Sequence, residues 1–364
     1  GMRSARANKG KQMEMFRSIF GILPDGRQVE LFSLKNQSGM QVDVITYGAT
    51  LVRLLVPLRN GGRRDVILGY DSLNGYLRGD SHQGAVVGRY ANRIAGGSYT
   101  HGGRTFFLTK NEKGINTLHG GENGFSRKLW SVSNVQEGEA PSVTLFYRSA
   151  DGEEGFPGNL EVWVQYTLQK DNTFVLDYRA VADRETPVNL TNHAYFNLAG
   201  GGTVEGHILQ MDAPCFTPAD ENGIPTGEIR PVQGTPMDFT MPKPIGRDIF
   251  QNYPPLRSVQ GYDHNFVLEK RGGCTRFAEL YDPQSGLAME TSTTMPGVQL
   301  YTADFLNPME TGKDGKPFVP RGAVCLETQY FPDSVHHPHF PSPFLRVGEE
   351  FCARTTYRFY DKGE

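Results

Sequence analysis

The chain has 364 residues, and its 37 basic and 40 acidic side chains leave a formal net charge of −3 at neutral pH. Charges of both signs are mixed along the chain, which argues against nucleic acid or an acidic membrane surface as its main partner. No apolar run is long enough to span a bilayer, and the four cysteines are too widely spaced for a zinc knuckle or a disulfide framework.

The N-terminal segment is basic and polar, and it lacks the apolar stretch of a signal peptide. We expect residues 1–15 to form a poorly ordered tail. Residues 16–364 are expected to form a single domain, because no long polar break interrupts the strand pattern that follows. The N-terminal segment also predicts a cytoplasmic protein, or an exported one if a leader was removed ahead of Gly1.

Apolar and polar residues alternate with a period of two along most of the chain, whereas helical periodicity is almost absent. In the clearest case, alternate residues from Leu160 to Leu168 are apolar, and a turn at Asp171 and Asn172 leads into a second such run. Strands are predicted at 42–46, 51–57, 143–147, 160–168, 174–180, 298–302, 323–327 and 351–360. Glycine, proline, asparagine and aspartate clusters separate them.

This pattern predicts an all-β protein, a large antiparallel β-sandwich with few short helices. The proline-rich segment 236–255 has few strand signals, so we expect it to be a surface excursion or to contain a helical turn. No repeat of fixed period is present, which argues against a propeller or a solenoid.

Several segments place polar groups inside otherwise apolar runs, where burial is costly unless the group is paired or functional. The first is 88–94, in which Asn92 and Arg93 can donate hydrogen bonds to hydroxyl groups. A solvated loop is the default interpretation of this motif taken alone. His119 precedes two glycines, so the backbone there can approach a ligand closely. A lone histidine in such a place is still more often structural.

The run 187–198 contains His193 and Tyr195 beside three asparagines, and this density of polar groups favours a lined site. Glu327 lies in a strand-like run beside Leu326, and it is the residue least easily explained as mere surface. An imidazole and a carboxylate that meet form an acid/base pair, able to give one proton and take another. Most of the functional interpretation depends on whether His193 and Glu327 meet.

Two further segments contribute Asp263 and Gln299. A turn with Asp263 capping backbone amides is an even alternative to a binding site, and Gln299 says little by itself. Together, the polar residues of these segments suit a molecule rich in hydroxyl groups, such as a sugar. No glycine-rich phosphate loop, G-x-S-x-G or H-E-x-x-H motif is present, so nucleotide, serine-hydrolase and zincin functions have no support.

The histidine tract 336–339 suggests a metal site by composition. Pro338 interrupts the tract and no cysteine lies near it, so a solvated loop is the better interpretation. The acidic turn 151–155 lacks the alternating ligand spacing of a calcium loop and is expected to be a solvated hairpin.

Eight segments resemble the galactose mutarotase (aldose 1-epimerase) family, in the family's order along nearly the whole chain. They are GRYANRI (88–94), LHGG (118–121), DGEEGFPG (151–158), PVNLTNHAYFNL (187–198), IPTG (224–227), GYDHNF (261–266), PGVQLYT (296–302) and CLETQ (325–329). Each motif alone is weak, but eight in order are highly specific. The family fold is a wide antiparallel β-sandwich, in agreement with the strand pattern.

The resemblance implies an isomerase that interconverts the α and β anomers of free aldohexoses such as galactose and glucose. It implies that Glu327 is the catalytic base, which takes the proton from the C1 hydroxyl, and that His193 is the acid, which protonates the ring oxygen. The sugar-binding residues that it implies are Asn92, Arg93, His119, Tyr195, Asp263 and Gln299. Because this chemistry is proton transfer only, no cofactor and no metal is expected.

Three alternatives stay open. A mutarotase for a sugar phosphate or another aldose would use the same fold, and the phosphate would need extra cationic side chains at the open end of the site. A non-catalytic carbohydrate-binding sandwich should lack an ionisable pair. A structural β protein would not explain polar residues in so many strand-like runs. We expect a monosaccharide as the partner, no nucleic acid or membrane, and a monomer or weak dimer.

Overall fold

The structure is a computed structural model that describes residues 15–269 and 272–363. The tail expected at 1–15 therefore lies outside the described residues, apart from Met15. Strands dominate the described part of the chain, and its α-helices are two short ones, α1 (Leu73–Arg78) and α2 (Pro254–Val259). The predicted all-β class is confirmed. Neither helix is long and apolar enough to cross a membrane.

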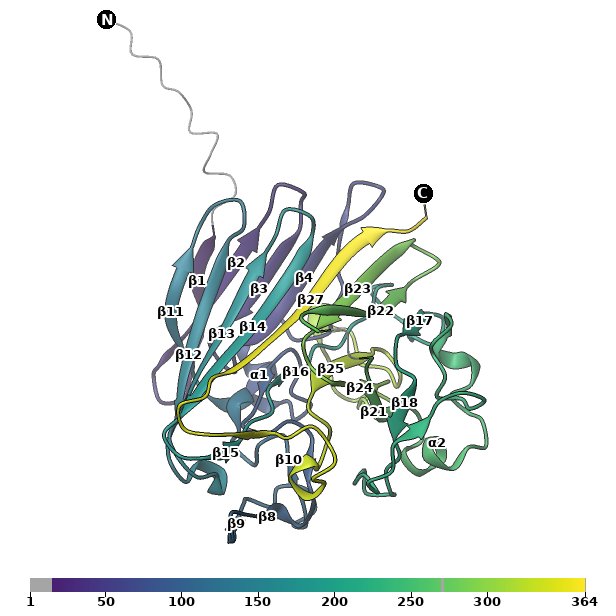
Figure 1. Ribbon diagram of the computed structural model, residues 1–364. Helices are drawn as coiled ribbons and strands as arrows, with labels where there is room; N and C mark the ends of the chain where they lie inside the picture. Colours follow the sequence, from purple (N-terminus) through teal and green to yellow (C-terminus); the bar gives the residue numbers. More distant parts are fainter. Residues whose placement is uncertain (1–14, 270–271, 364) are drawn as a thin grey trace, which may run out of the picture.

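The largest sheet has nine antiparallel strands and forms the front layer in Figure 1. Its order is β11 (Ser131–Gln136), β12 (Ser142–Ser149), β13 (Leu160–Leu168), β14 (Thr173–Ala182), β27 (Phe351–Asp361), β23 (Leu287–Thr293), β22 (Thr275–Tyr281), β17 (Ile208–Met211) and β20 (Lys243–Pro244). A five-stranded sheet lies behind its β11–β14 half (Figure 1). The order there is β1 (Phe16–Ile22), β2 (Gln28–Lys35), β3 (Gln41–Ile45), β4 (Thr50–Pro57) and β5 (Arg63–Asp65).

A second five-stranded sheet lies below β22 and β23 in Figure 1 and carries part of the site. Its order is β19 (Arg230–Pro231), β18 (Cys215–Thr217), β21 (Asp263–Val267), β24 (Gly297–Tyr301) and β25 (Cys325–Gln329). Two-stranded pairs complete the strands: β6 (Val86–Val87) with β16 (Thr191–Asn192), β7 (Arg93–Ile94) with β10 (Thr117–Leu118), β8 (Ser98–His101) with β9 (Arg104–Phe107), and β15 (Thr186–Pro187) with β26 (Phe344–Leu345). Single 3-10 turns lie at Ala95–Gly97, Phe125–Arg127, Glu153–Gly155, Ile245–Arg247, Lys313–Gly315 and Ser334–His336.

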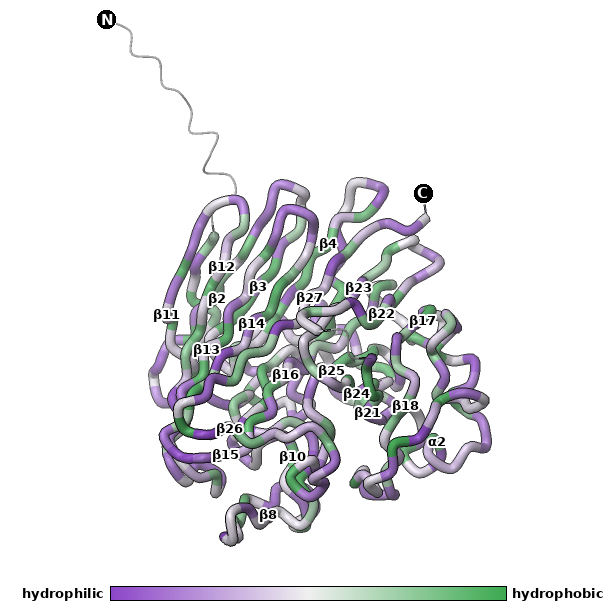
Figure 2. Tube along the Cα trace, viewed as in Figure 1, coloured by the Kyte–Doolittle hydropathy of each residue, from purple (hydrophilic) through white to green (hydrophobic). Residues whose placement is uncertain are grey.

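The core lies between the layers, and the alternation of β13 shows how the sequence builds it. Every second residue from Leu160 to Leu168 is buried, while the residues between them are half-exposed. Figure 2 shows the same alternation as hydrophobic and hydrophilic stretches along the strands. Inward side chains such as Phe32 and Leu54 join those of β13 in the main cluster of buried residues. Each such side chain contributes about 1.5–3 kcal/mol by leaving water.

The strand-like run around His193 is mostly not a paired strand. Only Thr191–Asn192 pairs as a strand, and the backbone groups that follow each find a different neighbour. The His193 N–H donates to Ala85 O at 2.9 Å, and the Phe196 N–H donates to Val324 O at 2.8 Å. The segment is buried, so its composition is as apolar as that of a strand. Its backbone hydrogen bonds are shared among several neighbours and do not form one continuous strand pair.

The proline-rich segment 236–255 contains the expected helical turn at Ile245–Arg247. It is not a surface excursion, because Met237, Phe239 and Ile249 are buried in the main core and β20 joins the nine-stranded sheet. Proline limits how long its strand pairing can be, and it does not prevent burial of the apolar side chains between the prolines.

Candidate functional site

A cavity of about 770 Å³ opens beside the second five-stranded sheet. Its lining brings together residues from distant parts of the chain. Seven of the eight residues predicted for the site line it, namely Asn92, Arg93, His119, His193, Tyr195, Asp263 and Glu327. Its volume falls within the range of small-molecule sites, about 300–1,000 Å³.

The predicted acid and base do meet. Glu327 Oε1 lies 3.3 Å from His193 Nε2, and only 3% and 6% of the two side chains are exposed. An antiparallel bridge between Phe196 and Val324 brings the two segments side by side. Glu327 Oε1 has no partner in hydrogen-bond geometry among the described residues. A buried acceptor left free in a cavity is a group that a ligand can satisfy.

Burial shifts both members of the pair towards their neutral forms. It raises the pKa of Glu327 well above the ordinary range, and the nearby Asp263 carboxylate raises it further against the opposing charge of Arg93. Burial, with a smaller contribution from His82, lowers the pKa of His193 to about 3. The pair therefore holds one exchangeable proton over a wide range of pH.

The imidazole of His193 is held from two sides. Tyr195 stacks against it with ring centroids 4.9 Å apart and an interplanar angle of 17°. The Tyr195 hydroxyl donates to Ser81 O at 2.7 Å, which fixes the tyrosine in turn. The thiol of Cys325 lies 3.6 Å from His193 Nδ1 and can give or take a weak hydrogen bond there. These contacts leave Nε2 as the nitrogen that faces Glu327.

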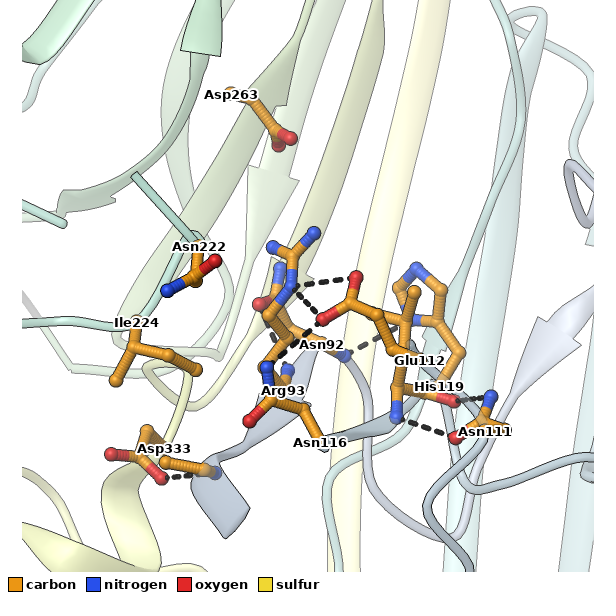
Figure 3. Close-up of polar contacts among 12 residues, drawn as sticks. Asn92, Arg93, Asn111, Glu112, Asn116, His119, Asn222, Ile224, Asp263 and Asp333 are labelled. Atoms are coloured by element: carbon orange, nitrogen blue, oxygen red, sulfur yellow. Dashed lines mark hydrogen bonds and ion pairs between the residues drawn. The ribbon is translucent and has the colours of Figure 1, made fainter. Parts of the chain in front are cut away.

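Asn92 and His119 hold each other through reciprocal hydrogen bonds, part of the network in Figure 3. The Asn92 N–H donates to His119 Nδ1 at 3.0 Å, and the His119 N–H donates to Asn92 O at 3.0 Å. Both residues have a left-handed backbone, with φ of 63° and 50°, which is uncommon outside glycine. Because a backbone amide can only donate, the neutral His119 ring carries its proton on Nε2. His119 is therefore a fixed hydrogen-bond donor.

His119, His193 and Glu327 each offer one ligand atom within 4.8 Å of the others, an arrangement that can hold a metal ion. The donor set does not fit this use. A metal would have to bind His119 at Nε2, because Nδ1 already accepts the Asn92 amide proton. That Nε2 carries the ring proton in the neutral form, so the site presents an N–H where a metal needs a lone pair.

Arg93 lines the same cavity as Glu327 and His193. Its Nε donates to both carboxylate oxygens of Glu112, at 2.8 and 3.0 Å (Figure 3). The Asp263 carboxylate faces the guanidinium from another side in the same view. Gly223 packs directly on Arg93, since a Cβ at Gly223 would lie 2.3 Å from Nη1, and its φ of +77° also favours glycine.

Gln299 is the predicted site residue that does not line the cavity. Its Nε2 donates to Asp263 Oδ1 at 2.9 Å, and its Oε1 accepts from Gln329 Nε2 at 3.1 Å. Gln299 lies opposite Glu327 in the pairing of β24 with β25. This position suits a residue that orients Asp263 rather than one that touches a ligand.

Sequence reasoning missed several lining residues. His82, Glu112, Asn222 and Tyr301 all face the cavity. Tyr301 lies inside the 296–302 motif, which was a usable signal. Glu112 lies between Asn111 and Lys113 in a charged loop and has the pattern of a solvated residue.

The histidine tract and the acidic turn have structural partners. His336 and His337 contact the Asp333 carboxylate at 2.5 and 3.2 Å, and Asp333 also accepts the Ala95 N–H at 2.9 Å. In the acidic turn, Glu154 accepts from a backbone N–H at 2.9 Å. The side chains of both segments make hydrogen bonds within the protein, whereas the sequence predicted solvated loops.

Comparison with known proteins identifies the family of the chain. A sequence model described as aldose 1-epimerase matches residues 30–358. The galactose mutarotase of Bos taurus is 44% identical over 346 residues, covering 94% of this chain and 98% of the relative. The aldose 1-epimerase of Escherichia coli K12 is 39% identical over 342 residues, covering 93% and 97%.

Two solved structures are similar to this one. The galactose 1-epimerase of Lactobacillus acidophilus matches with a TM-score of 0.86 and 27% identity, over 96% of this chain and 99% of that one. An aldose epimerase homologue from C. elegans matches with a TM-score of 0.83 and 30% identity, over 91% and 98%. With a family match across most of its length and relatives at this level of identity, the chain belongs to the aldose 1-epimerase family.

Proposed function

We propose that this protein interconverts the α and β anomers of free aldohexoses, with Glu327 as the base and His193 as the acid. The observation that carries the proposal is the buried contact of 3.3 Å between Glu327 Oε1 and His193 Nε2 at the wall of a sugar-sized cavity. The protein is an isomerase of the mutarotase class, in keeping with its family.

Opening a hemiacetal ring requires that O1 lose a proton while O5 gains one. Either transfer alone would build up charge in the transition state, and a paired base and acid avoid this. The one proton of the pair, which burial places on Glu327 at rest, first moves to His193 across their 3.3 Å contact. Glu327 then takes the O1 proton while His193 gives its proton to O5. The open-chain aldehyde then turns about the C1–C2 bond. Ring closure on the other face of C1 reverses the two transfers, so the pair returns to its starting state with one proton.

The other lining residues hold and polarise the sugar in this proposal. His119, a fixed N–H donor, faces the ring oxygen beside His193 and stabilises negative charge that develops there. Asp263 accepts hydrogen bonds from hydroxyl groups that do not react, and Gln299 keeps it oriented. Tyr195 acts mainly on His193 through ring stacking. Asn92 acts through His119, whose Nδ1 it holds.

The charge of the lining favours a neutral sugar over a sugar phosphate. Its cationic side chains are Arg78, Arg93 and Lys113, whereas its carboxylates are Asp80, Glu112, Glu221, Asp263, Glu310 and Glu327. Arg93, the cation deepest in the site, is already paired with Glu112. A dianionic phosphate would meet an excess of carboxylates and no dedicated cluster of donors.

A cytoplasmic location and a monomeric or weakly dimeric state remain part of the proposal. All four cysteines are unpaired, which suits a reducing compartment.

The test is polarimetry of freshly dissolved α-D-galactose and α-D-glucose with and without the protein. We expect a faster approach to the equilibrium rotation, and weak competition by galactose 6-phosphate. No acceleration with either sugar would contradict the proposal, and strong competition by the phosphate would favour a phosphorylated substrate instead.

A further inference from the structure

His82 lines the cavity beside the catalytic pair, yet it has no part in the proton transfers proposed above. Its ring is half-buried and lies 6.1 Å from the His193 ring, nearly parallel at 21°. It meets the His119 ring edge-on at 5.0 Å. His82 Nδ1 lies 2.9 Å from Ser126 Oγ, and Nε2 makes no hydrogen bond to another described residue. His82 thus brings a ring nitrogen without a described hydrogen-bond partner to the lining of the cavity, next to both histidines of the site.

The order of the strands places His82 at one end of a row of side chains. Asp263 lies on β21, and Glu327 lies two strands away on β25, across β24. The segment with His193 lies next to β25, through the Phe196–Val324 bridge. The segment 82–87 follows, because the Gly84 N–H donates to His193 O at 2.9 Å. The row therefore runs from Asp263 through Glu327 and His193 to His82.

The connectivity of a pyranose matches this row. C1 carries O1 and is bonded to the ring oxygen O5 on one side and to C2 on the other. With Glu327 at O1 and His193 at O5, the direction towards Asp263 leads to C2 and its hydroxyl group. The opposite direction, past His193, leads from O5 to C5 and the substituent that C5 carries.

We propose that His82 is a specificity-determining residue that hydrogen-bonds the exocyclic hydroxymethyl group at C5, so that the site favours aldohexoses over aldopentoses. This inference rests on the proposed function, because it needs the sugar placed by Glu327 and His193. A hydroxyl group can donate and accept, so it can pair with Nε2 in either tautomer of His82. Ser126 holds the ring through Nδ1, which leaves Nε2 pre-oriented.

Natural sugars provide matched substrates. L-arabinose has the ring configuration of D-galactose without C6, D-xylose stands in the same relation to D-glucose, and D-fucose is D-galactose without the O6 hydroxyl. We expect the wild-type protein to prefer D-galactose over D-fucose in kcat/KM by up to about tenfold, the effect of one hydrogen bond. Equal kcat/KM values for these two sugars would overturn the inference without any variant.

The His82→Phe substitution keeps an aromatic ring against His193 and removes the hydrogen bond. We expect it to lower kcat/KM for D-galactose and D-glucose by up to about tenfold and to leave L-arabinose, D-xylose and D-fucose unchanged. His101→Phe is the matched control, because His101 stacks on Phe344 outside the cavity, and it should change none of these values.

The other outcomes separate the two proposals. If His82→Phe slows hexoses and pentoses equally, His82 acts through the neighbouring histidines and the C5 assignment is wrong. If it slows none of them, His82 does not contact the sugar. Wild-type protein that accelerates none of the five sugars would overturn the mutarotase proposal itself, and the C5 inference with it.

Discussion

Glu327 and His193 face each other at 3.3 Å in the wall of the cavity, with only 3% and 6% of their side chains exposed, although they lie far apart in the sequence. In the proposed mechanism, this burial lets the carboxyl and the imidazole exchange protons with the substrate without competition from solvent. Glu327 Oε1 makes no hydrogen bond in the described structure, so it can bond to the sugar. His193 is held by Tyr195 and by Cys325 at Nδ1, which leaves its Nε2 for the substrate.

Replacing Glu327 by Gln should lower kcat for mutarotation by about 10²–10⁴-fold, because an amide of the same shape cannot accept the O1 proton. Polarimetry gives the rate, and circular dichroism checks the fold. Glu139→Gln is the control, because Glu139 is an exposed carboxylate paired with Lys170 on the surface, and its loss should not change kcat. A folded Glu327→Gln protein with turnover within a few-fold of wild type would refute the assignment of the base.

The pH profile of kcat/KM should be a broad bell. The pair is active only when it holds one proton. With two protons it has no group that can act as a base, and with no proton it has no group that can act as an acid. Burial lowers the pKa of His193 to about 3, so the acidic limb of the profile shifts to lower pH. Burial raises the pKa of Glu327, so the alkaline limb shifts to higher pH. Initial rates across buffers of constant ionic strength measure this. A narrow optimum bounded by the ordinary pKa values of Glu and His, about 4.3 and 6.5, would contradict it.

The Glu327→Gln variant should also be more stable than the wild type at neutral and alkaline pH. Unfolded Glu327 loses its proton near pH 4.3, whereas folded Glu327 keeps it to higher pH, since burial raises its pKa. Between these two pKa values the unfolded state binds fewer protons than the folded state. The free energy of unfolding of the wild type therefore falls by about 1.4 kcal/mol for each unit by which the pH rises. The amide of the variant does not titrate, so the variant does not lose this stability.

Thermal melts of both proteins at pH 4 and pH 8 measure this effect. The gain in melting temperature should appear at pH 8 and vanish at pH 4. Equal melting temperatures at both pH values would show that Glu327 ionises at its ordinary pKa in the fold.

The two arginines of the 88–94 motif should behave differently when replaced. Arg89 is only 2% exposed, and its guanidinium donates to backbone oxygens, including those of Pro157 and Gly158. Arg89→Met leaves these carbonyls unpaired in the core and should destabilise the fold by about 3–5 kcal/mol.

Arg93→Lys keeps a charge in the cavity and loses the guanidinium fork, so it should raise KM and leave stability nearly unchanged. Denaturant unfolding together with steady-state kinetics separates the two effects. A stable Arg89→Met protein with a raised KM would show that the two roles are exchanged.

Metal removal should leave activity unchanged, although His119, His193 and Glu327 lie close enough together to suggest a metal site. The Asn92 amide fixes the proton of His119 on the nitrogen that a metal would need. Dialysis against EDTA followed by polarimetry tests this. A loss of rate that zinc restores would show that the His119 tautomer is reversed and that a metal takes part.

The sequence by itself determined the all-β class and several of the strands, because the alternation that makes a strand amphipathic is local. The predicted strand at 160–168 has the same first and last residues as β13, Leu160 and Leu168. Glu327 and His193, which the structure brings together, were also singled out from the sequence, since a carboxylate and an imidazole in apolar runs are costly to bury without a partner or a function.

Only the tertiary structure decided how these residues divide their work. The approach of Glu327 to His193 depends on a bridge between Phe196 and Val324, and no local pattern encodes a pairing over such a distance. Arg89 and Arg93 look alike in the sequence, yet one binds carbonyls in the core and the other faces the cavity. His82 could not be predicted from the sequence, because it is a single histidine among polar loop residues. Only the fold brings its ring against those of His119 and His193.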